Sequence, residues 1–564
     1  MSAPTGSAAP TAATAAASVL LTLSSAQFLM TLDSSVMNVS IATVANDLDT
    51  TVTGIQTAIT LYTLVMASLM ITGGKIGQIM GHKRAFALGC VVYGAGSLTT
   101  SLAPNLAVML VGWSFLEGVG AALIMPAIIS LVAANAGPSD RPRAYGLVAA
   151  SGAVAVAVGP LIGGLLTTYG SWRWVFAGEV FIVAGILLLT SRLADSPREG
   201  SARLDWAGTL LSAAGLGLVV LGILQAGSWG FVNPKPGAPS WLGLSPAIWL
   251  VVAGGLVLRV FFGWERRRLA RGEEALLDPA MLGNPRLRAG LSAFFFQYLL
   301  QAGLFFAVPL FLSVALGLSA VETGARILPL SVTLLAAAVG VPKVFPTASP
   351  RLLVRIGFLL LFLGVATLLA ALEVGAGPEV VTWPLLLAGL GIGVLASQLG
   401  AVTVSSVPDE QSGEVGGLQN TLTNLGASIG TALSGAVLIS ALTASFLSGV
   451  SDNEAVPEEL SSQAQVDLAG GVPFISEDAL DEALTDAGVE GETAEAILDE
   501  NQASQIRGLR ASLAVLALVA LVALFVAGSV PDRPAGAGPP AERRGRHRDR
   551  AQRQSRQVPK ISRL

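Results

Sequence analysis

Two carboxyl side chains stand inside long apolar stretches of this chain, where a charged group is costly. Asp33 lies in the stretch that begins near Ser18, and Glu117 lies in another that is centred near Gly120. An ionisable group in such a stretch usually faces an aqueous cavity or a polar partner, and removal from water favours its neutral form. We therefore expect Asp33 and Glu117 to take up and release protons. The alternatives are that Asp33 bonds to a neighbouring helix and that Glu117 lies in water near a helix end.

A third carboxyl, Glu179, follows Arg173 in a further apolar stretch. Two roles remain open for it: proton coupling, or an ion pair with Arg173 on the same segment.

The segments that carry these carboxyls are typical of membrane-spanning helices. The chain has 564 residues, of which 52% are hydrophobic and 12% charged, and its mean hydropathy is +0.68. Apolar runs of about 20 residues recur throughout, and in lipid only a helix satisfies its own backbone over such a run. The sequence predicts an all-α integral membrane protein with fourteen spans. They are centred near Leu29, Leu64, Gly94, Gly120, Val156, Ala184, Gly215, Ala253, Gln301, Leu334, Leu363, Gly393, Gly430 and Ala517.

Basic residues gather in alternate loops, which predicts the orientation of the spans. The longest such group lies between the eighth and ninth spans: Arg266, Arg267, Arg268, Arg271, Arg286 and Arg288. Loops rich in Lys and Arg stay in the cytoplasm. We therefore expect a cytoplasmic N-terminal tail at 1–17 and a basic cytoplasmic tail at 531–564, which anchors near anionic lipid rather than binding nucleic acid.

The segment at 450–506 is predicted to be an acidic external loop. Between 452 and 500 it has many carboxylates and no Lys or Arg. Ser476 and Thr493 each precede acidic residues in the pattern of a helix start, so part of the loop should be ordered. The composition is compatible with a solvated linker, and also with a lid or a cation-collecting vestibule.

No energy-coupling or redox motif accompanies the spans. No G-x-x-x-x-G-K-[ST] sequence occurs, so no ATP-binding P-loop is available. Cys90 is the only cysteine, which excludes a disulfide or a cysteine cluster within the chain. We expect no enzyme activity, no catalytic residues, no metal and no cofactor.

Four local patterns occur in a fixed order. The first span ends in Leu32-Asp33-Ser34-Ser35-Val36-Met37-Asn38-Val39. The loop after the second span carries Gly74, Gly77, Gln78, Gly81, Lys83 and Arg84. The fourth span contains Ser114-Phe115-Leu116-Glu117-Gly118-Val119-Gly120-Ala121-Ala122. The fifth span contains Gly152, Gly159, Pro160, Gly163 and Gly164.

In this order the patterns resemble those of the major facilitator superfamily, and within it the fourteen-span drug:proton antiporter family. Gln78 and Ser114 stand where that family has an acidic and a basic residue, and Glu117 replaces its glutamine. The resemblance implies that the loop after the second span takes part in gating. It also implies that the antiporter motif of the fifth span lets helices pivot or seal, although packing alone is the alternative.

The resemblance further implies two six-helix bundles, at 18–195 and 271–530, with two extra central spans at 196–270. The central cavity between the bundles would then contain these polar side chains: Asn38, Ser114, Gln297, Gln301, Gln398, Asn420 and Asn424. Joining of helices is the alternative for the amides. Five phenylalanines could form an aromatic wall or face lipid: Phe294, Phe295, Phe296, Phe305 and Phe306.

The expected function is proton-coupled efflux of small amphipathic compounds across the plasma membrane. Import or metabolite export are alternatives, and a membrane sensor that uses the acidic loop is an alternative of another class. The expected partners are a small-molecule substrate, protons and membrane lipid, with no nucleic acid, and we expect a monomer.

Overall fold

The computed structural model describes residues 12–136, 141–195, 204–235, 237–345, 348–404, 406, 412–468, 471–530 and 532. Most of the predicted tails at 1–17 and 531–564 lies outside these residues. Within the described part of the chain the secondary structure is helical, apart from an isolated bridge between Trp241 and Leu244.

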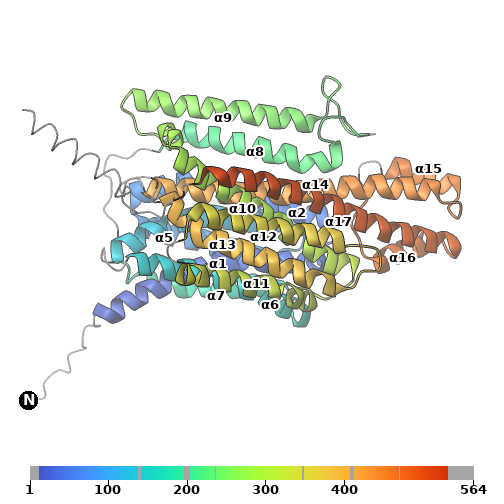
Figure 1. The fold of residues 1–564 in the computed structure, drawn as a ribbon, viewed down its shortest axis with the longest axis horizontal. Coiled ribbons are helices and arrows are strands. Elements are labelled where there is room, and N and C mark those ends of the chain that lie inside the picture. Colours follow the sequence, from blue (N-terminus) through green and yellow to red (C-terminus); the bar gives the residue numbers. More distant parts are fainter. Residues whose placement is uncertain are drawn as a thin grey trace, which may run out of the picture.

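The long helices lie side by side in one elongated bundle (Figure 1). In the first half they are α1 (Ala12–Asp47), α2 (Val52–Met80), α3 (His82–Ser101), α5 (Gly118–Asn135), α6 (Arg141–Tyr169) and α7 (Arg173–Thr190). The central pair is α8 (Trp206–Trp229) and α9 (Pro246–Ala270). In the second half they are α10 (Pro285–Leu310), α11 (Ala320–Val344), α12 (Pro350–Ala371), α13 (Thr382–Val404), α14 (Ser412–Asp452) and α17 (Glu492–Val526).

The predicted membrane-spanning architecture is confirmed. Each of the fourteen predicted span centres falls in one of these helices, and thirteen of the helices are long and apolar enough to cross a membrane. The fourteenth is α3, which has 20 residues and begins with His82, Lys83 and Arg84. These polar residues lower its mean hydropathy, yet the helix packs along α5 and α7 like its neighbours.

Helices begin where the sequence supplies capping residues. Asn105 caps the short helix α4 (Leu106–Met109) by accepting a hydrogen bond from Val108 N at 3.1 Å. Ser245 before Pro246 does the same for α9, and Ser319 starts α11 with a capping box. Such caps satisfy backbone N–H groups that have no partner inside the helix.

The two halves meet along two pairs of helices, α6 with α11 and α2 with α14. The central helix α8 also contacts both halves, through α2 and α14. Its partner α9 lies beyond it, at the outer edge of the molecule (Figure 1).

The acidic segment folds into helices at the end of the bundle opposite the N-terminal end of α1 (Figure 1). These are α15 (Glu458–Asp467), α16 (Glu477–Asp486) and the start of α17. Ser476 caps α16 as predicted, but the predicted start at Thr493 is wrong by two residues, because Gly491 is the N-cap of α17. Val472 and Phe474 are buried in the main core, so this segment packs against the bundle.

Candidate functional site

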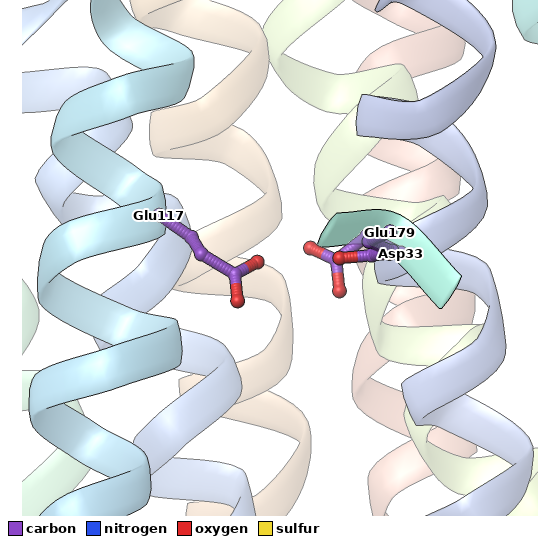
Figure 2. Close-up of side chains that lie close together, drawn as sticks. All are labelled: Asp33, Glu117 and Glu179. Atoms are coloured by element: carbon purple, nitrogen blue, oxygen red, sulfur yellow. The ribbon is translucent and has the colours of Figure 1, made fainter. Parts of the chain in front are cut away.

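The three carboxyl groups singled out in the sequence come together inside the first half of the bundle. Asp33 comes from α1, Glu117 from the end of a π-helical turn, and Glu179 from α7. One oxygen from each carboxylate lies within 4.8 Å of the other two, and none of the three residues is more than 1% exposed. Figure 2 shows the Glu117 carboxylate directed towards Asp33 and Glu179. Like charges this close repel, so ionisation of one carboxylate affects the other two.

A π-helical turn, η1 (Leu110–Glu117), positions two of the site residues. It joins α4 and α5 into one span, Leu106–Val132. A π-helical turn changes the direction in which side chains leave the helix, and such turns are common at functional sites. Trp113 and Glu117 both leave this turn and are both buried.

Hydrogen-bond donors surround the carboxylates unevenly. Trp113 Nε1 donates to both oxygens of Asp33, at 2.9 and 3.0 Å. Tyr93 and Ser97, both on α3, donate to Glu179 Oε2 at 3.2 and 3.1 Å. Among the described residues, Glu117 Oε2 and Glu179 Oε1 have no hydrogen-bond partner. These two oxygens are therefore open to a further hydrogen bond.

The structure discriminates between the roles that the sequence left open. Glu117 is buried rather than exposed at a helix end. Glu179 does not pair with Arg173, because the guanidinium of Arg173 pairs with Asp47 at the end of α1. Asp33 does bond to a neighbouring helix, through Trp113, so that alternative holds alongside any proton role.

A cavity of about 220 Å³ lies next to this cluster, between the two halves. Its lining contains amides, hydroxyls, methionines and aromatic rings, and none of the described residues that line it is charged. Four of the predicted cavity residues line it: Asn38, Gln301, Asn420 and Asn424. Lining of this kind suits an uncharged, partly polar ligand.

The other predicted cavity residues lie elsewhere. Ser114 is buried and donates to the carbonyl oxygen of Ala58 at 2.8 Å. Gln297 is buried within the bundle, and Gln398 bonds to Ser397. Of the five phenylalanines, Phe305 alone lines this cavity. Gln297 lies four residues from Gln301, so the sequence placed both on one face, but only one of them reaches the cavity.

Two stacked rings separate the cavity from the carboxylate cluster. Tyr62 and Trp113 both line the cavity, with ring centroids 5.2 Å apart and an angle of 12° between the planes. None of the three carboxylates lines the cavity. Trp113 therefore contacts both compartments: its ring borders the cavity and its N–H holds Asp33.

The motif expected in the loop after the second span lies mostly in helices, because α2 continues to Met80 and α3 begins at His82, so only Gly81 stands between them. The segments that follow α7 and α9 hold this motif. Lys83 donates to the carbonyl oxygens of Ser191 and Leu193, at 3.1 and 2.7 Å. Lys75 pairs with Glu274 at 2.6 Å. Gly81 has a φ of +96°, which a residue with a side chain rarely adopts.

The remaining motif residues occupy the same corner. Gly74 and Gln78 line a small pocket together with Lys75 and Leu276. Gly77 lies against the His82 ring. Arg84 is exposed. The ion pair between Lys75 and Glu274 ties this corner to the segment that follows α9.

The antiporter motif on α6 is a contact surface between helices. Gly152, Gly159 and Gly163 face Gln27, Ser35 and Val36 of α1. Gly164 faces the backbone of Ala320, and Gly324 of α11 lies against the carbonyl oxygen of Pro160. A side chain at Gly324 would collide with that backbone. The glycines therefore permit close contact both within the first half and between the halves.

Several residues of the site carried no signal in the sequence. Trp113, Tyr62, Tyr93 and Ser97 are common residue types in membrane helices, and nothing in their spacing sets them apart. Trp113 precedes Glu117 by four residues, so the two side chains should lie near one face of the fourth span. This spacing identifies Trp113 as a site residue only if Glu117 is already known to point inward. Glu274 lies almost 200 residues from Lys75, so only the fold reveals that pair.

Carboxylates in this arrangement could also hold a hard cation. The indole N–H of Trp113 competes for Asp33, because it bonds to both oxygens of that group. The surrounding donors thus favour protons over a metal in this cluster.

Comparison with known proteins agrees with this geometry. A sequence profile of the Major Facilitator Superfamily matches residues 23–431. The puromycin resistance protein pur8 of Streptomyces alboniger is 32% identical over 76% of this chain and 82% of its own length. A probable actinorhodin transporter of Streptomyces coelicolor is 29% identical over 79% of this chain and 75% of its own length. Among solved structures, a bacterial homologue of the human lysosomal transporter Spinster, in an inward-facing conformation, has a TM-score of 0.58 at 15% identity, covering 94% of this chain and 100% of that one. The chain is a multi-pass membrane protein that belongs to the major facilitator superfamily.

Proposed function

We propose that this transporter exports small amphipathic, drug-like compounds across the bacterial plasma membrane in exchange for protons. The observation that carries the proposal is the buried cluster of Asp33, Glu117 and Glu179 beside an uncharged cavity. The names of two relatives, a puromycin resistance protein and a probable actinorhodin transporter, support drug-like compounds as substrates. The uncharged lining favours substrates that are neutral, or whose charge stays in water.

Trp113 supplies the link between substrate and proton in this mechanism. Its N–H favours the ionised form of Asp33, since a hydrogen bond to a carboxylate stabilises the charge. A substrate that holds the ring of Trp113 against Tyr62 would strengthen that bond and favour proton release from Asp33, and protonation of Asp33 would in turn favour substrate release. Proton loading and substrate release then alternate as the two halves rock about the cavity.

The energetics suit an uncharged substrate. An inward proton supplies about 2.3 kcal/mol per 100 mV, enough for a roughly fifty-fold gradient of a neutral compound exchanged with one proton. The proposal includes cytoplasmic termini at both ends of the chain, action as a monomer, and no enzymatic step.

Purified protein in liposomes tests the proposal. With an imposed pH gradient, we expect a panel of aromatic antibiotics that includes puromycin to move against the proton flux. Asp33→Asn should lower gradient-driven flux at least about tenfold, since it removes the charge that a proton would neutralise. Asp47→Asn is the matched control on the same helix, because Asp47 bonds to Trp172 and Arg173 outside the cluster.

Other outcomes point to the alternatives. Accumulation in the same direction as proton flux would indicate import, and flux driven only by a sodium gradient would reject proton coupling. If no compound in the panel moves under any gradient and substrates release no protons, the export proposal fails.

A further inference from the structure

An open groove runs along the outer face of α9. Its walls come from α9, from the short 3-10 helix η2 (Pro279–Gly283) and from the start of α10, and its volume is about 1200 Å³. Figure 1 shows α9 at the edge of the molecule, with α8 between it and the rest of the bundle. The groove therefore faces the surrounding membrane rather than the central cavity.

Four arginines line the groove: Arg259, Arg266, Arg267 and Arg288. All four are exposed, and none forms an ion pair with a described carboxylate. Their neighbour Arg268 behaves differently, because it pairs with Asp205 at 3.0 Å and with Glu273 at 3.4 Å. The groove thus has an uncompensated positive charge, although acidic residues are available nearby.

Arg259 is the most informative of the four. It precedes Arg266 by seven residues on one helix face, which places it about 10 Å deeper along α9. A charged group inside a membrane span is costly unless it meets water or an anion, and a long side chain can reach towards the interface. An anion held by Arg266 and Arg267 would also be within the reach of Arg259.

The deeper part of the groove is apolar. Leu256, Val260 and Phe262 line it. A Cβ atom built on Gly255, Gly263 or Gly283 would meet no atom within 4 Å, so the groove has room along its length. Cationic groups at one end and a hydrocarbon channel at the other match a molecule with an anionic head and an acyl chain.

We propose that this groove binds an anionic phospholipid, with its phosphate among the four arginines and an acyl chain along Leu256 and Val260. The lipid would come from the leaflet next to the basic loops. The site lies on α9, η2 and the start of α10, apart from the cavity and the carboxylate cluster, so the inference does not depend on the transported substrate.

Native mass spectrometry of the full-length protein tests this inference. The protein in mild detergent is offered equal amounts of phosphatidylglycerol and phosphatidylcholine. We expect the wild-type protein to retain phosphatidylglycerol in preference to phosphatidylcholine. The triple variant Arg259→Gln, Arg266→Gln and Arg267→Gln should lose this preference, because each arginine removed should lower the affinity for phosphatidylglycerol about fivefold. Arg286→Gln is the matched control, since Arg286 is exposed and basic on the same helix as Arg288 but does not line the groove.

A second variant tests the groove without changing its charge. It also gives a result if the triple variant does not fold. Gly263→Leu fills the groove while all four arginines remain, and it should weaken retention of phosphatidylglycerol severalfold. Unchanged retention in either variant would overturn the proposal. If inorganic phosphate displaces the bound phosphatidylglycerol, the groove is a general anion site and the lipid proposal fails. If the spectrum shows a dimer without lipid adducts, a second copy of the chain covers the groove and the proposal also fails.

Discussion

Trp113 is the residue at which the proposed substrate and proton sites meet. The indole ring stacks on Tyr62 at the cavity wall, and the indole N–H bonds to Asp33. Phenylalanine at this position would keep the ring and remove the N–H, so it separates the two contacts.

Trp113→Phe should therefore alter coupling more than binding. Without the N–H the neutral form of Asp33 persists to higher pH, so the pH at which exchange is half-maximal should rise. A hydrogen bond to a charged group contributes about 1.5–3 kcal/mol, which corresponds to a rise of about one pH unit or more. The measurement is liposome flux as a function of pH, with substrate affinity measured separately and expected to change less than about threefold.

Trp249→Phe provides the control for that experiment. It removes an indole N–H that bonds to the carbonyl oxygen of Trp241, far along the sequence from the cluster. A pH profile unchanged in Trp113→Phe, or shifted equally in both variants, would contradict the coupling role of Trp113.

The sequence identified the carboxylates but not their partners. Asp33 and Glu117 stood out because charge is rare in apolar stretches, and that physical cost is readable from composition alone. Trp113 reaches Asp33 across 80 residues of chain, so its role depends on how α1 packs against η1. The π-helical turn that aims Trp113 has no sequence signature of its own, which is why the site could not be assembled in advance.

Among the elements, the contact between α6 and α11 joins the two halves through backbone. Gly324 lies against Pro160, and Val321 N donates to the hydroxyl of Thr168 at 3.0 Å. A side chain at 324 cannot fit while the helices touch.

Gly324→Val should hold α6 and α11 apart. Overpacking of a close contact costs about 1–3 kcal/mol, so flux should fall roughly tenfold or more while the protein still folds. Spin labels on cysteines placed at Tyr169 and Arg326, both exposed, would report a longer distance between the helices. The only native cysteine, Cys90, is buried and should not interfere.

Gly340→Val is the control on the same helix, because a side chain at 340 meets nothing within 4 Å. If Gly324→Val leaves both the label distance and the flux at the values of Gly340→Val, the contact has no gating role. At this scale the sequence did well: hydropathy located each span, and the glycine and proline spacing located the contact helix. It could not name α11 as the partner, since that pairing is set by the packing of two separate bundles.

Across the whole molecule, charge is divided between the two ends of the bundle. The acidic helices α15 and α16 lie opposite the end at which α1 begins (Figure 1). Positive loops predict the cytoplasmic side, so the acidic end should face outward.

Labelling from one side of the membrane checks this orientation. Ala487→Cys, exposed after α16, should react with a membrane-impermeant maleimide on intact cells. Arg286→Cys, exposed at the start of α10, should react only after the membrane is permeabilised. The reverse pattern would invert the topology and with it the direction of proposed transport, and the wild-type protein with buried Cys90 gives the background.

The aromatic wall formed by Tyr62 and Trp113 has a consequence for how this transporter can evolve. Amides such as Asn420 and Asn424 line the cavity on one side of this wall, and the three carboxylates lie on its other side. A substitution among the amides therefore need not disturb the carboxylates. Substitutions in the cavity lining would change which compounds are transported and leave the proposed proton coupling intact. New resistance phenotypes should therefore arise by single changes among the amides, whereas Asp33 and Trp113 should remain fixed in every functional descendant.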